Sequence, residues 1–267
     1  SGINGVLNIE IIPRRSGRTH LARRRTRLLL DLKLLLRRMA YTNSITLDNR
    51  LNWHRLMIRT KILDRHLKEL FVHGVEAPDG TKFGGKGFRS TWQESVAACG
   101  SALILGKDVA APMIRDLGLA LAMGQTPISI MAAQMGKSGS NMGGGQENGG
   151  GRDLHIGEWS RGILPPTAPL PIASATTTGI ALASSRLGLD RFHLAPVGEG
   201  CSSNGEFWEA INFAGARGLP ICYIIQNNQI ALDTFSNKQS GAETFGDKGA
   251  SVGLPSWTID GSDPASY

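Results

Sequence analysis

Residues 192–234 read FHLAPVGEGCSSNGEFWEAINFAGARGLPICYIIQNNQIALDT. An apolar run at 192–197 leads into a glycine turn, and a helix-like stretch at 204–216 separates it from a second apolar run at 221–225. This order predicts a strand, a turn, a helix and a second strand, which together make one βαβ unit. Glu199 follows the first strand and Asn228 follows the second. In a parallel sheet both residues reach the same carboxyl edge, where ligands bind in open α/β folds.

The residue types at this edge indicate a metal-bridged diphosphate. Glu199 offers an anionic oxygen, Asn228 a neutral amide oxygen, and the backbone carbonyl of Ile230 a third oxygen. Mg²⁺ prefers near-octahedral oxygen ligands and completes its shell with water and phosphate. The amide groups at the start of the 204–216 helix suit an anion, and Gly198 and Gly200 permit a tight turn. The alternative is an ordinary nucleotide-type turn in which Glu199 is solvated.

The motif Gly198-Glu199-Gly200, followed after 26 residues by Asn227-Asn228, resembles the thiamine-diphosphate fingerprint. The flanking residues are similar to the α subunit of the E1 component of 2-oxo acid dehydrogenase complexes. The GEG form and the triplet Asn212-Phe213-Ala214 resemble the branched-chain type. The resemblance implies thiamine diphosphate and Mg²⁺ as cofactors, with Glu199, Asn228 and Ile230 holding the metal. The pyruvate and acetoin types stay open as alternatives.

The resemblance extends from about Trp53 to Tyr267 and assigns further roles. Arg115 matches an arginine that grips the diphosphate, and Ile114 stands where the family has a tyrosine. Ala168 and Leu170 match the stretch that cradles the aminopyrimidine ring and props the cofactor into its bent shape. The resemblance also places Gly200 and Cys201 against the cofactor. Gln226 departs from the branched-chain pattern, which has an arginine there.

His155 ends a segment, 151–155, that resembles the close of a family loop. It is a candidate catalytic base, with anchoring of the loop as the favoured alternative. The preceding tract, 136–151, is half glycine, so we expect neither helix nor ordered strand there. Thr91 and Glu94 have the spacing of a helix-capping box.

The fold class that these patterns predict is α/β, with a mostly parallel sheet flanked by helices; the resemblance makes it the thiamine-diphosphate-binding fold. The run 51–72 predicts a long amphipathic helix, and 172–187 predicts a helix of small residues. Residues 39–267 are expected to form the domain. That domain is expected to be incomplete at its carboxyl end, because residues 257–264 resemble a segment after which the E1α fold continues. No apolar run approaches 18 residues, so we expect no transmembrane helix.

Residues 1–38 form a basic leader that we expect to lie outside the fold. They hold nine Arg and one Lys against two acidic residues, whereas residues 39–267 have a net charge of −1. Three explanations compete: upstream sequence before Met39, a mitochondrial presequence, or a segment that binds nucleic acid or an anionic membrane. The third is the weakest, so we expect neither partner. Three cysteines without CxxC spacing predict a reducing compartment, the cytoplasm, or the mitochondrial matrix if the leader is a presequence.

The activity implied by the resemblance is oxidative decarboxylation of a small 2-oxo acid, with acyl transfer to a lipoyl group on an E2 protein. The family's α subunit works with an E1β subunit, or with a fused β-like region, which supplies the acid that activates the cofactor. A second hypothesis is a non-catalytic E1α-like remnant that binds a partner subunit but holds the cofactor poorly. A third is a transketolase-type enzyme. The amino-terminal half of this chain is not rich in histidine, which argues against that class.

Overall fold

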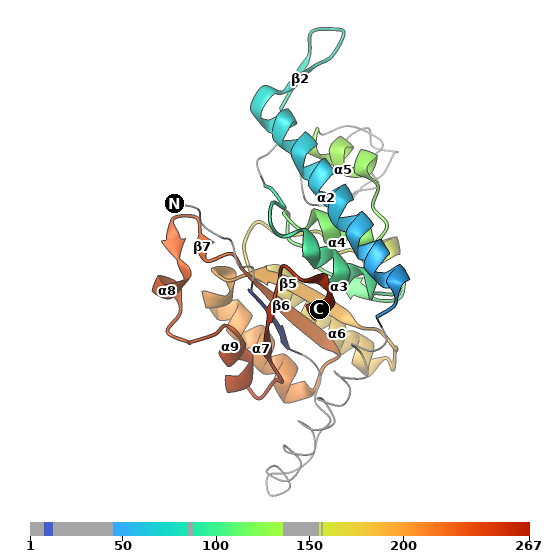
Figure 1. The fold of residues 1–267 in the computed structure, drawn as a ribbon. Coiled ribbons are helices and arrows are strands. Elements are labelled where there is room, and N and C mark those ends of the chain that lie inside the picture. Colours follow the sequence, from blue (N-terminus) through green and yellow to red (C-terminus); the bar gives the residue numbers. More distant parts are fainter. Residues whose placement is uncertain (1–7, 13–44, 85–87, 136–154, 156) are drawn as a thin grey trace, which may run out of the picture.

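The computed structural model describes residues 8–12, 45–84, 88–135, 155 and 157–267 (Figure 1). Its central sheet has the strand order β4-β5-β6-β1-β9. These strands are β1 (Asn8–Ile12), β4 (Val109–Ala110), β5 (His193–Gly198), β6 (Ile221–Asn227) and β9 (Trp257–Asp260). Two short hairpins pair β2 (Val75–Glu76) with β3 (Lys82–Phe83) and β7 (Ile230–Ala231) with β8 (Thr234–Phe235). The α-helices are α2 (Leu47–His73), α3 (Ala97–Ser101), α4 (Leu117–Ala122), α5 (Pro127–Gln134), α6 (Ile172–Arg186), α7 (Gly205–Arg217), α8 (Ser236–Gln239) and α9 (Gly246–Ser251).

The predicted βαβ unit is confirmed. Strands β4, β5 and β6 are parallel, and α7 connects β5 to β6. The register pairs His193 with Ile221 and Gly198 with Gln226, so that β5 and β6 reach the same edge together. The α/β class predicted from the sequence is therefore correct, and the expected bounds of these elements differ from the observed ones by one or two residues.

Strand β1 lies between β6 and β9 and is antiparallel to both. It follows that β9 runs in the same direction as β6. The structure therefore differs from the expectation that residues 1–38 lie outside the fold, because it places Asn8–Ile12 within the sheet. The sequence NIEII is rich in β-branched isoleucine, which favours a strand, and β6 presents backbone groups that need partners. The other leader residues lie outside the described part, so the expected boundary at residue 39 stays a prediction.

Both faces of the parallel strands are buried. Along β6, Ile221, Tyr223 and Ile225 pack with the inner sides of α6 and α7, whereas Cys222 and Ile224 pack on the opposite face with Val96 and Leu119. A strand covered on two sides is apolar along its whole length rather than alternating. This burial explains why 221–225 reads as one continuous apolar run in the sequence.

Helix α2 forms an outer layer with α4 and α5, as Figure 1 shows. Its buried stripe includes Leu56, Leu63, Leu67 and Leu70, which meet Leu117 of α4 and its neighbours. The helix has 27 residues. Within the described residues, however, no helix is both long and apolar enough to cross a membrane.

The amino-terminal cap of α2 is a capping box that the sequence analysis did not find. Thr46 accepts a hydrogen bond from the backbone of Asn49, and the Asn49 side chain accepts one from the Thr46 backbone. The box predicted at Thr91 and Glu94 is wrong. The Thr91 hydroxyl instead donates to the buried carboxylate of Asp64 in α2 at 2.8 Å, a charge-assisted hydrogen bond, whereas a capping hydroxyl would accept from a backbone N–H at the start of a helix.

His193, at the first position of β5, is fully buried. Its Nδ1 lies 2.9 Å from the Pro220 carbonyl oxygen and its Nε2 lies 3.1 Å from the Ser184 hydroxyl. Burial disfavours the charged imidazolium and lowers the pKa of His193 below its ordinary value of 6.5.

We therefore expect the chain to lose stability as the pH falls. A histidine whose pKa is lowered on folding stabilises the native state above its unfolded pKa, and that stability is lost as the pH drops from about 6.5 through the lower folded value. Urea unfolding at pH 7.5 and 5.5 should show the loss in the natural chain. In His193→Asn the free energy of unfolding should fall less between pH 7.5 and pH 5.5, although it is lower than that of the natural chain at pH 7.5. An equal pH slope in both chains would contradict the assignment.

Candidate functional site

Glu199 and Asn228 follow β5 and β6 at the carboxyl edge of the parallel sheet. The two segments meet there, because the backbone N–H of Asn228 lies close enough to the Glu199 carboxylate to lower its pKa. Only 1% of Glu199 is exposed. Burial raises the pKa of this carboxyl, although its own N–H, the charge of Arg115 and the Asn228 N–H lower it in part. Glu199 Oε1 has no hydrogen-bond partner among the described residues.

Arg115 approaches the same edge from the turn that precedes α4. Its Nη2 donates to the Gln226 carbonyl at 3.4 Å, and a Cβ built at Gly198 would lie 3.4 Å from the same nitrogen. Its Nε is buried and, within the described residues, unpartnered. An unmet donor on a guanidinium and an unmet acceptor on a carboxylate thus lie beside one edge. A cation at Glu199 and an anion at Arg115 would satisfy both atoms, so these residues fit a Mg²⁺-diphosphate group.

The backbone of Arg115 is held by a relay from α2. Asp64, which is 2% exposed, accepts hydrogen bonds from Arg89 Nη2 at 2.7 Å and from the Ser90 backbone at 2.7 Å. The Ser90 hydroxyl in turn donates to the Arg115 carbonyl oxygen and accepts from the Leu117 backbone. The turn that carries Arg115 is therefore fixed by a carboxylate 51 residues earlier in the chain.

Gln226 is fully buried in β6. Its Nε2 donates to Asp116 Oδ1 at 2.8 Å, whereas its Oε1 has no partner among the described residues. Asp116 also accepts from the Met113 backbone, and burial raises its pKa. Asp116 is thus engaged by Gln226 and Met113, and the nearby charge of Arg115 lowers its pKa in part.

The loop after β6 is shaped by its two asparagines. The Asn227 side chain accepts from the Gln229 backbone at 2.8 Å, and the Asn228 side chain accepts from the Ile230 backbone at 3.2 Å. Gln229 has a φ of 72°, and Ile230 pairs with Phe235 in the β7–β8 hairpin. The side-chain oxygen of Asn228 therefore lies next to the Ile230 backbone. That Asn228 and Ile230 hold a metal stays a prediction.

Gly200 is required by a close contact rather than by an unusual backbone angle. Its φ of −62° is open to any residue. A Cβ at this position, however, would lie 2.4 Å from the Ala231 Cβ and 3.0 Å from Gln239 Oε1. The absent side chain thus lets the 198–200 turn touch the β7–β8 hairpin.

Cys201 follows Gly200 and packs into the core beside α7. Burial raises the pKa of its thiol to about 12, so the group is protonated at neutral pH. Cys201 is therefore a small packing residue of the core, and its expected contact with the cofactor stays a prediction.

Ala168 and Leu170 lie in the exposed turn before α6. Asn204, at the start of α7, donates from Nδ2 to the Leu170 carbonyl at 3.1 Å. This bond joins the turn to the end of the 199–203 segment, so Leu170 lies on the same side of the molecule as Glu199. Its side chain is 54% exposed. Ile114 is half-buried beside Arg115.

His155 is half-buried, but its neighbours 136–154 and 156 lie outside the described residues. The glycine-rich tract falls within that range. Both the catalytic role and the anchoring role considered for His155 stay predictions. Across the described ranges no three His, Cys, Asp or Glu side chains gather in a metal-binding cluster. The expected Mg²⁺ set contains one carboxylate, an amide and a carbonyl and does not need such a cluster.

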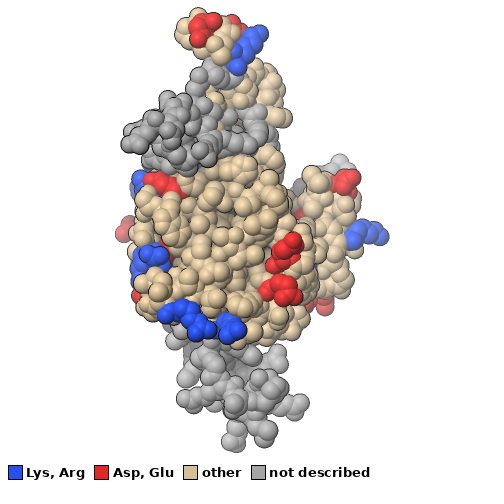
Figure 2. Space-filling view, turned by 180° about the vertical axis from the view of Figure 1, so that it is seen from behind, with Lys and Arg blue, Asp and Glu red and all other residues tan. Residues whose placement is uncertain are grey.

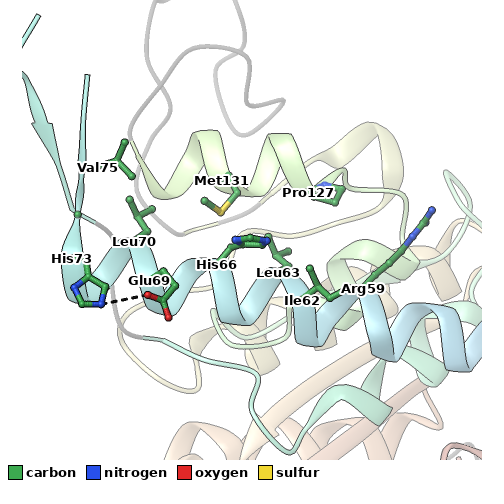
Figure 3. A pocket seen from close by; sticks show the side chains of 11 residues that line it. Arg59, Ile62, Leu63, His66, Glu69, Leu70, His73, Val75, Pro127 and Met131 are labelled. Atoms are coloured by element: carbon green, nitrogen blue, oxygen red, sulfur yellow. Dashed lines mark ion pairs between the residues drawn. The ribbon is translucent and has the colours of Figure 1, made fainter. Parts of the chain in front are cut away.

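A separate groove lies between α2 and α5 (Figure 3). It has a volume of about 470 Å³ and mostly apolar walls, with Arg59 and His66 along α2. At its end His73 Nε2 lies 3.4 Å from a Glu69 carboxylate oxygen. None of the candidate site residues lines this groove, so it is distinct from the edge of the sheet that carries Glu199.

Comparison with known proteins gives the family. The family described as dehydrogenase E1 component matches residues 85–266. Similar proteins include the α subunit of 2-oxoisovalerate dehydrogenase from Bacillus subtilis (strain 168), 31% identical over 64% of this chain and 51% of that one. The α subunit of acetoin:2,6-dichlorophenolindophenol oxidoreductase from Cupriavidus necator is 31% identical over 56% of this chain and 43% of its own length. The pyruvate dehydrogenase E1 α subunit of Staphylococcus aureus (strain MRSA252) is 41% identical over 33% of this chain and 24% of its own length.

This protein belongs to the dehydrogenase E1 component family, and its resemblance to the α subunits is confirmed. At most about half the length of these relatives is matched.

The contact at Gly200 can be tested with one methyl group. We expect Gly200→Ala to lower the free energy of unfolding by about 1–3 kcal/mol, the usual cost of overpacking. The matched control is Gly205→Ala at the start of α7, where a Cβ meets nothing within 4 Å. Urea unfolding of both variants measures the difference. Equal stability of the two would show that the turn and the hairpin do not touch as described.

The burial of Glu199 predicts an unusual pH dependence. A carboxyl whose pKa is raised on folding costs stability once it ionises, so its stabilising effect is present below the unfolded pKa and is lost as the pH rises through the folded value. Without Mg²⁺, Glu199→Gln should therefore raise the Tm at pH 8. The gain should fade as the pH falls toward 4.5, the ordinary pKa of this group. Glu209→Gln on the exposed side of α7 is the control, and an identical response from both variants would refute the burial argument.

Proposed function

We propose that this chain binds Mg²⁺ and thiamine diphosphate and acts as an E1α-type subunit. The proposed reaction is oxidative decarboxylation of a 2-oxo acid, with acyl transfer to a lipoyl group on a separate E2 protein. One observation carries the proposal. Glu199 Oε1 and Arg115 Nε are buried and, in the part of the chain that the structure describes, have no hydrogen-bond partners. They lie at the edge of the sheet where open α/β folds bind ligands.

The proposed roles follow from the chemistry of the side chains. Glu199, Asn228 and the Ile230 carbonyl supply oxygen ligands for Mg²⁺. Arg115 grips the diphosphate, since a guanidinium matches phosphate oxygens. Four further residues serve the organic part of the cofactor. Ala168 and Leu170 support the aminopyrimidine ring, and Gly200 and Cys201 give the backbone close access.

When bound, thiamine diphosphate would supply the carbon nucleophile and take up the electron pair that stays behind when CO₂ leaves. The protein's own part is to hold the diphosphate, to orient the rings and to exclude water. His155 is the one residue of this chain proposed as a base. We propose that a β-type subunit supplies the acid that activates the ring.

The composition of the surface supports the binding of a partner subunit. Figure 2 shows a broad face on which charged side chains are sparse and lie mainly at the margins. Large apolar side chains are also exposed on α6 and α7, including Ile172, Trp208 and Phe213. Apolar surface of this extent is common where subunits meet.

The substrate class is a small 2-oxo acid. The branched-chain type is favoured by the GEG motif and the 212–214 triplet, and a 2-oxoisovalerate dehydrogenase α subunit is among the similar proteins. Pyruvate and acetoin enzymes are also among them. A test of activity should therefore compare branched and unbranched 2-oxo acids.

A second function, that of a non-catalytic E1α-like subunit, is favoured by Gln226. The Gln226 amide nitrogen is bonded to Asp116, and a neutral amide cannot replace the charge of an arginine next to a diphosphate. Such a chain would still associate with a β-type subunit but would bind the cofactor weakly.

The deciding experiment is a calorimetric titration of thiamine diphosphate, with and without Mg²⁺, into the full chain co-expressed with a β-type subunit. We expect binding that depends on Mg²⁺. Glu199→Ala should weaken it by more than about 100-fold, since loss of a metal ligand costs more than the 10–100-fold typical of an outer partner. Glu209→Ala should leave it unchanged. A folded complex that binds no cofactor would contradict the proposal and favour the non-catalytic subunit.

A further inference from the structure

Lys248 is a buried lysine that the sequence analysis did not single out. It lies in α9, and only 4% of it is exposed. Lysines are almost never buried this deeply unless their ammonium group has partners. The Lys248 Nζ donates to two oxygens of one residue, the Ser202 carbonyl and the Ser202 hydroxyl, each at 2.9 Å.

Aromatic rings surround the same ammonium. Nζ lies 4.9 Å from the centroid of the Phe245 ring and 5.5 Å from that of the Trp208 ring. Both distances fall within the range of about 6 Å for a cation–π interaction. Trp208 belongs to α7 and Phe245 precedes α9. Side chains from two helical segments thus hold one cation against the 201–203 turn.

This cation is linked to Glu199 by a single residue. The Ser202 hydroxyl donates to the Glu199 carbonyl oxygen at 2.6 Å, and the Ser202 backbone N–H donates to the same oxygen at 3.1 Å. Ser202 is itself fully buried. The chain of contacts therefore runs from α9 through Lys248 and Ser202 to the backbone of Glu199.

We propose that Lys248 is a positioning residue that fixes the 199–203 turn through Ser202 and thereby sets the place of the Glu199 carboxylate. The role of Lys248 in the turn follows from the geometry alone. Its consequence for Mg²⁺ and thiamine diphosphate rests on the proposed function. Lys248 acts through the turn and contacts neither the metal nor the substrate.

The turn can be tested without any cofactor, because Cys201 lies within it. Its thiol is buried, so alkylation requires the turn to open. We expect Lys248→Met to raise the iodoacetamide labelling rate of Cys201 by about tenfold, the size expected from losing one charge-assisted hydrogen bond. Cys222 in β6 is the internal control. Peptide mass spectrometry separates the two sites.

Two further variants keep this test decisive. Lys68→Met, on the exposed side of α2, changes the net charge equally and should not alter Cys201 labelling. Ser202→Ala removes the hydroxyl but no large side chain, so it keeps the test valid if Lys248→Met does not fold. Ser202→Ala should also raise the labelling rate of Cys201. In the double variant with Lys248→Met the rate should rise by less than the product of the two single effects, because both residues act on one hydrogen-bond network. Unchanged Cys201 labelling in a folded Lys248→Met or Ser202→Ala variant would overturn the proposal.

Cofactor binding then tests the consequence for the site. In the full chain with its β-type subunit, Lys248→Met should weaken Mg²⁺-dependent binding of thiamine diphosphate by about 10–100-fold, as for other residues that orient a metal ligand. Lys248→Arg keeps a donor and should restore part of the affinity. If the variant lowers the Tm but binds as tightly as the natural chain, Lys248 is structural only and the proposal fails. If the natural chain itself binds no cofactor, the proposed function fails, and the labelling result alone decides the role of Lys248 in the turn.

Discussion

The parallel pairing of β5 with β6 is the constraint on which the candidate site depends. Because His193 pairs with Ile221 and Gly198 with Gln226, the two strands end together. Glu199 and Asn228 then meet at one edge although 28 residues separate them along the chain. A slip of one residue in this register would move every side chain of β6 to the opposite face and would bury Cys222 where Tyr223 now lies. The same apolar packing that sets the register therefore also sets the geometry of the site.

At this edge of the sheet, polar groups without hydrogen-bond partners lie directly above a well-packed apolar core. Beneath it, Tyr223 is fully buried, donates to the Ala210 carbonyl and meets Phe207 edge-on at 5.8 Å. Above it, Glu199 and Arg115 each keep a buried atom without a partner in the described part of the chain. Unpartnered buried polar atoms are costly, and a folded protein tolerates them where the surrounding core supplies the stability. A bound ligand would offset that cost.

The sequence predicted the fold around this site well, since the elements there have strong local patterns. Continuous apolar runs, a glycine turn and helical spacing identify β5, α7 and β6. The types of side chain make Glu199 and Asn228 candidates for the site, and their roles stay predictions. Two features were beyond local patterns. The insertion of β1 beside β6 joins residues more than 200 positions apart. The Thr91 hydroxyl could accept from a backbone N–H at a helix start or donate to a carboxylate, and only the tertiary structure shows that it donates to Asp64.

The supports of the site were also invisible in the sequence, for a physical reason. Arg115 is held through Ser90 by Asp64, and the Glu199 turn is bonded through Ser202 to Lys248. Each relay depends on one charged side chain, Asp64 or Lys248, that belongs to no sequence motif. Each relay ends at a backbone carbonyl, a group that every residue has, so the sequence does not mark it. A motif records the groups that face a ligand, whereas the groups that orient them are fixed only by where distant helices pack. In this chain α2 and α9 approach the site from different sides, so its geometry depends on both layers of the fold as much as on the motif itself.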